Sequence, residues 1–374
     1  MKASKMYQMK IRKLVSIFLV LVMCVSAAGC ADGAGSMTTD KKSIVCTIFP
    51  EYDWVKEIVG SNADRFELTM LLNNGVDMHS YQPTASDMAK IATCDLFIYV
   101  GGESDAWVED ALKEAVNKDM QVVNLLEILG DSVKEEEIVE GMEEEHHDEH
   151  HEEDSEVPSD KNEHHEEGPE YDEHVWLSLK NAGILVEAIS KAVATIDAPN
   201  ASVYTENAKT YNDKLEQLDS EYKKAVESAK TKTLLFGDRF PFRYLTDDYG
   251  LDYYAAFAGC SAETEASFDT VTFLAGRVDE LALGHVMVLE SADQKIAQTI
   301  IDNTKSKNQT ILVLNSMQAV SCDETAQGVE SDSMENNEIA KRGEESDSVA
   351  GIENRVTYLG IMEDNLEVLK EALN

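Results

Sequence analysis

The sequence predicts an α/β protein with two lobes, each a parallel sheet flanked by helices, joined by one long rigid helix. The chain has 374 residues, enough for two domains of ordinary size. Short apolar runs alternate with segments of helical periodicity, which indicates parallel sheets with crossover helices. Between the two sets of strands, residues 201–229 keep one apolar stripe at helical spacing over many turns. A helix of that length would join two lobes stiffly.

The first lobe is expected over residues 43–182. Residues 44–49 predict a buried strand that Pro50 ends, because proline cannot donate to a sheet. A short helix at 54–59 is closed by Gly60. The remaining elements are strands at 66–72, 96–100 and 121–125 and helices at 85–92 and 106–116.

Residues 183–230 are predicted to be linker helices, and residues 231–374 the second lobe. Helical spacing runs from residue 175 to residue 196, and the long helix follows Pro199. The second lobe should contain strands at 233–236, 253–257, 286–289 and 310–314, with helices between them and a closing amphipathic helix at 356–373.

The first 29 residues have the composition of a secretory signal. Basic residues precede an apolar run at 15–25, and small residues lead to Cys30. This pattern resembles the lipobox of bacterial lipoproteins, although Ala27 stands where leucine is commonest. The resemblance implies cleavage before Cys30 and lipid on that cysteine. The residues that follow are small and polar, so residues 30–42 are predicted to be a flexible, lipidated tether. A simple signal peptide or a transmembrane anchor is the alternative, but the apolar run is short for a span. All three readings place the rest of the chain outside the cytoplasm, and lipidation attaches it to the cell membrane.

Acidic residues dominate two long stretches of the chain. The net charge of −40 argues against nucleic acid as a partner. Residues 135–170 are nearly all Glu, Asp and His, with too few apolar residues to form a core. We therefore expect a loop that is disordered without metal, and a second disordered acidic loop at 323–349.

Six of the nine histidines lie in the first of these loops. Neutral imidazole binds zinc, copper or nickel, and the flanking carboxylates attract cations. Because the spacing is irregular, we expect weak, multiple and exchangeable metal binding, with a solvated acidic loop as the alternative. The loop histidines are His146, His147, His150, His151, His164 and His165.

Four cysteines remain outside the N-terminal segment, widely spaced and without a CxxC pair. The compartment allows a disulfide, but the sequence gives no pairing. We expect buried free thiols in or near strands. The four are Cys46, Cys94, Cys260 and Cys322.

Two isolated histidines stand in settings typical of a ligand site. His79 follows the strand at 66–72 and a glycine-containing loop, and a helix follows it. Ligands of open α/β sheets bind just beyond the carboxyl ends of such strands. His174 lies between acidic residues and the apolar triplet Val175-Trp176-Leu177. Together with the histidine-rich loop, these residues make capture of a transition metal the leading hypothesis. The alternative for each is an ordinary hydrogen-bonded histidine.

The chain resembles the zinc- and manganese-binding group of ABC-transporter substrate-binding lipoproteins (metal-binding cluster A-I). The resemblance runs from residue 44 to the closing helix, outside the two acidic loops, and implies two α/β lobes with the metal between them. Further matching stretches are 49–54, 249–251, 261–267 and 358–366. The two specific motifs are Gly75-x-Asp77-x-His79-x-Tyr81-x-Pro83-Thr84 and His174-Val175-Trp176-Leu177.

The resemblance also implies a ligand set of three histidines and a carboxylate, or of two histidines and two carboxylates. His79 and His174 match the first two ligands. The position of the third ligand in the family aligns with Arg239, whose guanidinium has no lone pair to offer a cation. The adjacent Asp238 is the candidate there, and a turn or ion-paired carboxylate is the equal alternative. The fourth position aligns with Asn315, whose amide oxygen is a neutral and weaker ligand.

Three further residues of the second lobe are weaker candidates. Glu263 and Glu265 match an acidic pair of the family that is more often structural than ligating. His285 precedes a predicted strand, and we expect an ordinary loop or core histidine there.

The sequence therefore predicts a monomeric, lipid-anchored protein that captures Zn²⁺ and delivers it to the membrane permease of an ABC importer and its ATPase. Mn²⁺ is the alternative cargo, because oxygen-rich sites suit manganese. The runner-up is a metal-binding adhesin or buffer without a transporter. We expect no enzymatic activity: a metallohydrolase needs a general base beside an open metal position, and no HExxH or Ser/His/Asp arrangement occurs.

Overall fold

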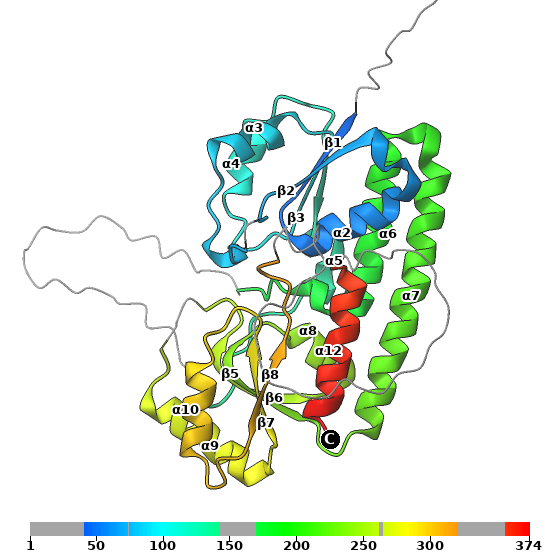
Figure 1. Cartoon of the computed structure of the whole chain (residues 1–374). Helices are drawn as coiled ribbons and strands as arrows, with labels where there is room; N and C mark the ends of the chain where they lie inside the picture. The colour runs from blue at the N-terminus through cyan, green and yellow to red at the C-terminus, as the bar shows by residue number, and fades with distance from the viewer. Residues whose placement is uncertain (1–40, 74, 143–169, 262–264, 321–355) are drawn as a thin grey trace, which may run out of the picture. The chain divides into compact units, whose positions relative to one another are not determined.

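The computed structural model describes residues 41–73, 75–142, 170–261, 265–320 and 356–374. Two parallel sheets of four strands form the frame of these residues (Figure 1). The strand order is β2-β1-β3-β4 in the first sheet and β6-β5-β7-β8 in the second. The two-lobed α/β prediction is confirmed. The strands are β1 (Lys42–Cys46), β2 (Phe66–Met70), β3 (Leu96–Tyr99), β4 (Gln121–Asn124), β5 (Thr233–Phe240), β6 (Asp252–Ala258), β7 (His285–Leu289) and β8 (Thr310–Leu314).

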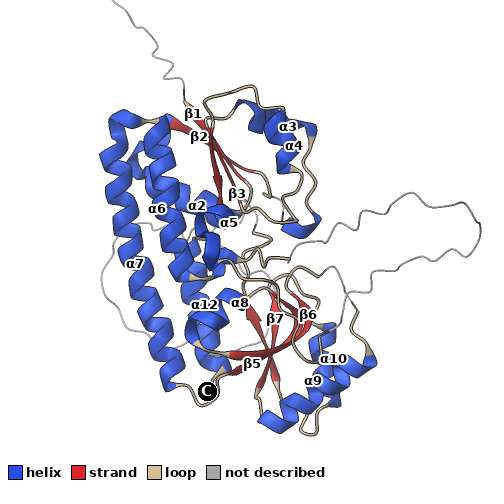
Figure 2. Ribbon diagram, turned by 180° about the vertical axis from the view of Figure 1, so that it is seen from behind, coloured by secondary structure: helices blue, strands red, loops and turns tan. Residues whose placement is uncertain are grey.

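Helices flank both sheets (Figure 2). Short 3-10 turns, among them η2 (Met78–Ser80) and η4 (Val175–Leu177), occur in the connections. The first lobe contains α2 (Phe49–Val59), α3 (Ala85–Thr93), α4 (Val108–Lys113) and α5 (Leu125–Leu129), and the second contains α8 (Arg243–Tyr249), α9 (Phe268–Leu281), α10 (Lys295–Asn303) and α12 (Tyr358–Ala372). Two longer helices, α6 (Leu179–Ile196) and α7 (Ala201–Ser228), lie between them in the chain.

The long helix α7 contacts elements of both lobes. It packs against α2 and α6 on one side of the molecule and against α8 and α12 further along (Figure 1). The Tyr222 hydroxyl donates to the carbonyl of Met362 in α12 at 2.6 Å. Its buried stripe is the one that the sequence predicts: Tyr204, Ala208, Tyr211, Leu215, Leu218, Tyr222 and Val226.

The central strands of the two sheets are largely buried on both faces, as is typical of parallel sheets. β1 pairs in parallel with β2 and β3, and its residues Ile44, Val45 and Cys46 are fully buried. Because all strands of one sheet point the same way, their carboxyl ends share an edge. The loops at that edge carry the candidate site.

Several element boundaries differ from the sequence prediction, three of them by four residues or more. Phe49 belongs to α2 rather than to β1, because Pro50 fits the first turn of a helix, where no amide donor is needed. β5 ends at Phe240 instead of residue 236. The helix predicted from residue 175 begins as a separate turn, and α6 starts after Ser178, whose hydroxyl caps it.

The prediction of disorder throughout residues 135–170 is wrong for its first part. Residues 134–142, which we call the docked segment, lie on the second lobe. Glu135 forms an antiparallel bridge with Tyr171. Opposite charges from the second lobe offset the entropy of ordering this acidic chain. The ion pairs are Glu137 with Arg243 and Glu140 with Arg277.

Among the described residues, none of the helices has the length and apolar character needed to cross a membrane. The predicted signal at 1–29, Cys30, the six loop histidines and the acidic stretch 323–349 lie outside the described residues.

Candidate metal centre

His79 lies in a turn that the preceding loop stabilises. The turn η2 follows β2, and the Asp77 carboxylate begins it by accepting a hydrogen bond from the His79 amide at 3.0 Å. The His79 Nδ1 atom lies 2.8 Å from Ser104 Oγ, in the loop after β3. Loops at the carboxyl ends of two strands therefore orient this ring.

His174 is fully buried at the start of η4. Asp172 Oδ1 accepts a hydrogen bond from the His174 amide at 2.8 Å and lies 2.9 Å from its Nδ1. The Tyr244 hydroxyl of α8 donates to the Asp172 carbonyl at 2.8 Å. A carboxylate on Nδ1 fixes the ring and leaves Nε2 to bind a metal, the arrangement found around zinc-binding histidines.

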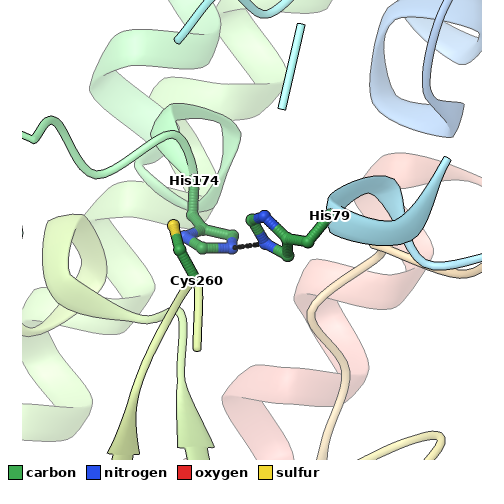
Figure 3. Close-up of side chains that lie close together, drawn as sticks. All are labelled: His79, His174 and Cys260. Atoms are coloured by element: carbon green, nitrogen blue, oxygen red, sulfur yellow. Dashed lines mark hydrogen bonds between the residues drawn. The ribbon is translucent and has the colours of Figure 1, made fainter. Parts of the chain in front are cut away.

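The Nε2 atoms of His79 and His174 face each other 3.1 Å apart (Figure 3). When each Nδ1 carries the proton toward Ser104 or Asp172, both Nε2 atoms present lone pairs. Tetrahedral zinc with bonds of about 2.0–2.1 Å holds two nitrogens about 3.3 Å apart. The spacing of the two rings therefore fits one shared cation.

Cys260 brings a third ligand-type atom to the two rings, from the second lobe. It follows β6 by two residues. One ligand atom from each of His79, His174 and Cys260 lies within 4.8 Å of the others. Glu136 of the docked segment accepts a hydrogen bond from the Cys260 amide through Oε1 at 2.9 Å. The group therefore joins both lobes.

Gln318 reaches the same point from the loop after β8. Its Nε2 atom lies 3.3 Å from His79 Nε2 and is in close contact with His174 Nε2. The nitrogen and oxygen of a carboxamide exchange places by rotation, so the same side chain can present Oε1 to a cation. The preceding residue, Met317, has a φ of 62°. Such backbone strain is found where a loop must place a functional side chain.

Neither Cys260 nor Gln318 was predicted from the sequence to belong to this group. A buried free thiol was expected at Cys260, and only the glycine before it offers a signal. A Cβ at Gly259 would lie 2.9 Å from the Phe240 carbonyl and 3.1 Å from His174 Cε1. Glycine is needed there for the end of β6 to approach the histidine ring.

The surroundings keep the His79 ring neutral. Burial, with the nearby His174, lowers the pKa of His79 to about 3. Metal binding requires the lone pair of a neutral imidazole, so the ring is ready to bind at neutral pH. Burial also raises the pKa of the Cys260 thiol, and the Glu136 carboxylate adds to that effect.

Asp238 lies in β5, beside a cavity of about 440 Å³ that His79 and Arg239 also line. Its Oδ2 accepts from the Leu289 amide at 2.9 Å, and its Oδ1 accepts from the Arg239 amide at 2.8 Å. Among the described side chains, its carboxylate is not part of the group formed by the two histidines and the cysteine. The assignment of Asp238 as the third ligand stays a prediction.

Arg239, at the position aligned with the family's third ligand, forms an ion pair across the two lobes. Its Nη2 donates to Asp77 Oδ2 at 2.6 Å. The partner is the carboxylate that begins the His79 turn, so the arginine braces that turn from the opposite lobe.

Asn315 is engaged within the loop that carries Gln318. Its Oδ1 accepts from the Met317 amide at 2.8 Å. Its own amide donates to Asn365 Oδ1 at 2.9 Å, and its carbonyl accepts from Asn365 Nδ2 at 2.8 Å. These bonds tie the loop to α12, and a ligand role for Asn315 stays a prediction.

The other candidate residues are not in the group. His285 begins β7, at the opposite edge from the carboxyl ends of the strands, and its Nδ1 lies 2.7 Å from Thr310 Oγ1. Glu265 is described but is not one of the three group members. Glu263 and Cys322 lie outside the described residues.

Comparison with known proteins identifies the family of this chain and matches its fold. A family model described as "Zinc-uptake complex component A periplasmic" (ZnuA) matches residues 44–372. The chain belongs to the ZnuA family. The resemblance inferred from the two histidine motifs is thereby confirmed at the level of the family.

Relatives of this ZnuA-family chain include proteins of similar length and longer ones. The "High-affinity zinc uptake system protein ZnuA" of Bacillus subtilis is 29% identical over 362 residues, which is 96% of each chain. "Zinc-binding protein AdcA" of Streptococcus pyogenes is 28% identical over 293 residues, which is 77% of this chain and 52% of AdcA. The chain thus spans about half the length of that relative. The Zn(II)-bound ZnuA-like domain of Streptococcus pneumoniae AdcA superposes with a TM-score of 0.61 and 25% identity, covering 89% of this chain and 99% of the domain.

Proposed function

We propose that this chain captures Zn²⁺ outside the cytoplasm, between its two lobes, and delivers it to the permease and ATPase of an ABC importer. The observation that carries the proposal is the pair of Nε2 atoms of His79 and His174, 3.1 Å apart. Both rings are held from behind by bonds to Nδ1. Two imidazoles placed in advance for one cation are suited to tight capture, because little entropy is lost on binding.

The choice of zinc over manganese follows from the ligand atoms. Imidazole nitrogen suits Zn²⁺, whereas Mn²⁺ prefers carboxylate and carbonyl oxygen. The two oxygen ligands expected from the sequence, Asp238 and Asn315, already accept hydrogen bonds from backbone amides. Relatives are named as zinc-binding or zinc-uptake proteins.

The N-terminal segment and the histidine-rich loop extend this proposal. Lipid on Cys30 would hold a monomeric protein at the membrane surface, close to its permease. The loop histidines would collect zinc weakly and exchange it quickly, because no preorganised shell holds the ion.

Chelator competition tests the binding site. His79→Ala and His174→Ala should each weaken binding of one Zn²⁺ per chain by at least about 100-fold, the upper range for losing an outer-shell partner, because here the ligand itself is lost. His285→Ala is the matched control, since that ring lies at the opposite edge of its sheet. Unchanged affinity in both variants would reject the site.

Uptake of radioactive zinc by cells tests the transport role. Cells that carry His79→Ala should take up less zinc at limiting supply than cells with the original protein. If binding is lost in vitro but uptake is equal, a buffer or adhesin without a permease becomes the better account.

A further inference from the structure

We propose that Cys260 supplies a thiolate ligand to the captured ion, so that the centre is a mixed nitrogen–sulfur site. The inference deepens the proposed function and rests on it, because it concerns the same ion. Residue 239, which aligns with the family's third ligand, is an arginine in this chain and is paired with Asp77.

The sheet explains how the cysteine reaches this place. β5 and β6 are neighbouring parallel strands, and Arg239 lies opposite Phe257 in their register. The carboxyl end of β6 therefore delivers Cys260 to the edge where the residue aligned with the third ligand stands. Cys260, which follows β6, would thus take the place of the ligand that Arg239 in β5 cannot provide.

The distances are close to those of a zinc site. Bonds of about 2.3 Å to sulfur and about 2.0–2.1 Å to nitrogen put tetrahedral sulfur and nitrogen ligands about 3.6 Å apart. The ligand atoms of Cys260, His79 and His174 lie within 4.8 Å of one another. A side-chain movement of about 1 Å at most would therefore bring the three ligand atoms to the spacing of a zinc site.

The neighbours of Cys260 hold it in position for this role. Its amide donates to Glu136 Oε1 at 2.9 Å, and Gly259 lets the strand end come against the His174 ring. Figure 3 shows the sulfur beside the His174 ring, on the second lobe. The Gln318 Nε2 atom lies 3.3 Å from His79 Nε2 and in close contact with His174 Nε2, so the carboxamide, once rotated, would offer its oxygen as a fourth ligand.

The other described thiols have different surroundings. Cys46 lies within β1 and Cys94 at the end of α3, both fully buried in the core. The Cys94 thiol donates to the Ile91 carbonyl at 3.3 Å. Cys260 is partly exposed, so an arriving ion can reach it.

The chemistry of the step is a proton exchange. The Cys260 thiol loses its proton to solvent as the sulfur–metal bond forms, and no electron is transferred. Thiolate is a soft ligand that selects zinc and disfavours manganese. The cysteine thus determines the discrimination between the two cargo ions, beyond what two imidazoles provide.

Cobalt(II) is a spectroscopic substitute that distinguishes sulfur from nitrogen ligands. One equivalent of Co²⁺ added to the reduced, metal-free full chain should give an intense sulfur-to-cobalt charge-transfer band in the near ultraviolet. The histidine-rich loop contains no cysteine, so it cannot give this band. Cys260→Ser should abolish the band, whereas Cys94→Ser and Cys322→Ser should keep it.

Alkylation of the wild-type chain provides a second test that needs no variant. Zn²⁺ should protect Cys260 from iodoacetamide, as measured by peptide mass spectrometry, and Mn²⁺ should not. Tight Co²⁺ binding without the band, together with an unprotected Cys260, would overturn the sulfur ligand and leave zinc capture standing. Failure of the wild-type chain to bind either metal tightly would instead overturn the proposed function.

Discussion

The buried carboxyl group of Glu51 should make the folded protein less stable as pH rises. Glu51 is fully buried in α2. Its Oε2 accepts hydrogen bonds from the amides of Thr47 at 2.8 Å and Ile48 at 3.3 Å, while Oε1 has no partner among the described residues. Burial, with the nearby Asp105 carboxylate, raises the pKa of Glu51 to about 8.

The sign and size of the effect follow from proton linkage. Between the ordinary pKa of 4.5 and the folded-state pKa of about 8, the folded chain holds a proton on Glu51 that the unfolded chain has lost. The free energy of unfolding therefore falls as pH rises through this window. At pH 7, about 2.5 pH units above the ordinary pKa, the free energy of unfolding has fallen by roughly 3 kcal/mol, because each pH unit contributes about 1.36 kcal/mol.

Glu51→Gln should remove this loss, because the amide has no proton to release and keeps an oxygen for Thr47 and Ile48. The variant should match the wild type near pH 5 and exceed it in stability by up to about 3 kcal/mol near pH 7. Urea denaturation of metal-free protein at several pH values measures the difference. Glu67→Gln, at an exposed position of β2, is the control. A stability difference that stays constant from pH 5 to pH 8 would refute the reasoning, since it would mean that buried Glu51 is ionised.

Three further predictions concern stability and the metal centre. Arg65→Ala removes the two 2.7 Å bonds from the guanidinium to the buried Asp197 and should cost about 1–3 kcal/mol in thermal unfolding. Because the pKa of Asp197 is held below its ordinary value, chiefly by hydrogen bonding to Arg65, this cost should be full above about pH 4 and disappear in stronger acid. Asn315→Ala should lower zinc affinity, because it loosens the loop that carries Gln318. In a chain that already has Gln318→Ala, the same change should have little further effect on zinc affinity. If the two losses of affinity add, Asn315 is itself a ligand. Deleting residues 143–169 should reduce the zinc ions bound per chain in calorimetry and keep the tight site, and equal stoichiometry would contradict zinc binding by the loop.

The elements that local sequence determines were predicted well. The β1 run of apolar residues and the α7 stripe depend on residue type and period alone, so both are found where expected. Pro50 was misinterpreted because it suits two contexts, the end of a strand and the first turn of a helix. In the structure Phe49 and Pro50 belong to the first turn of α2, and both are buried.

The candidate site was predictable only in part. His79 and His174 stand in motifs with distinctive neighbours, so the sequence alone made both of them candidates. Cys260 and Gln318 follow strands and stand in no distinctive motif, and the order of the strands brings them to the two rings. Asp238 was singled out because it is adjacent to Arg239, the residue at the aligned position. Its carboxylate accepts hydrogen bonds from amides of β5 and β7, which the sequence does not predict.

The order of the docked segment was missed for the same reason. Its composition alone predicts a solvated chain, since acidic residues repel one another. Arg243 and Arg277, more than a hundred positions later in the sequence, supply the opposite charges. Long-range pairing of this kind depends on the finished fold.

The long helix α7 affects how quickly an ion can leave. It has 28 residues, about 42 Å of continuous helix, and its buried stripe packs on elements of both lobes. A wide hinge motion between the lobes would have to break that packing. We therefore expect the ion to leave through small movements of the residues around the cavity that His79 and Arg239 line. Arg239 and Asp77, which form an ion pair between the lobes, both line this cavity. The residence time of zinc should then depend on how often this pair separates, and a membrane partner that attracts either charge would shorten it.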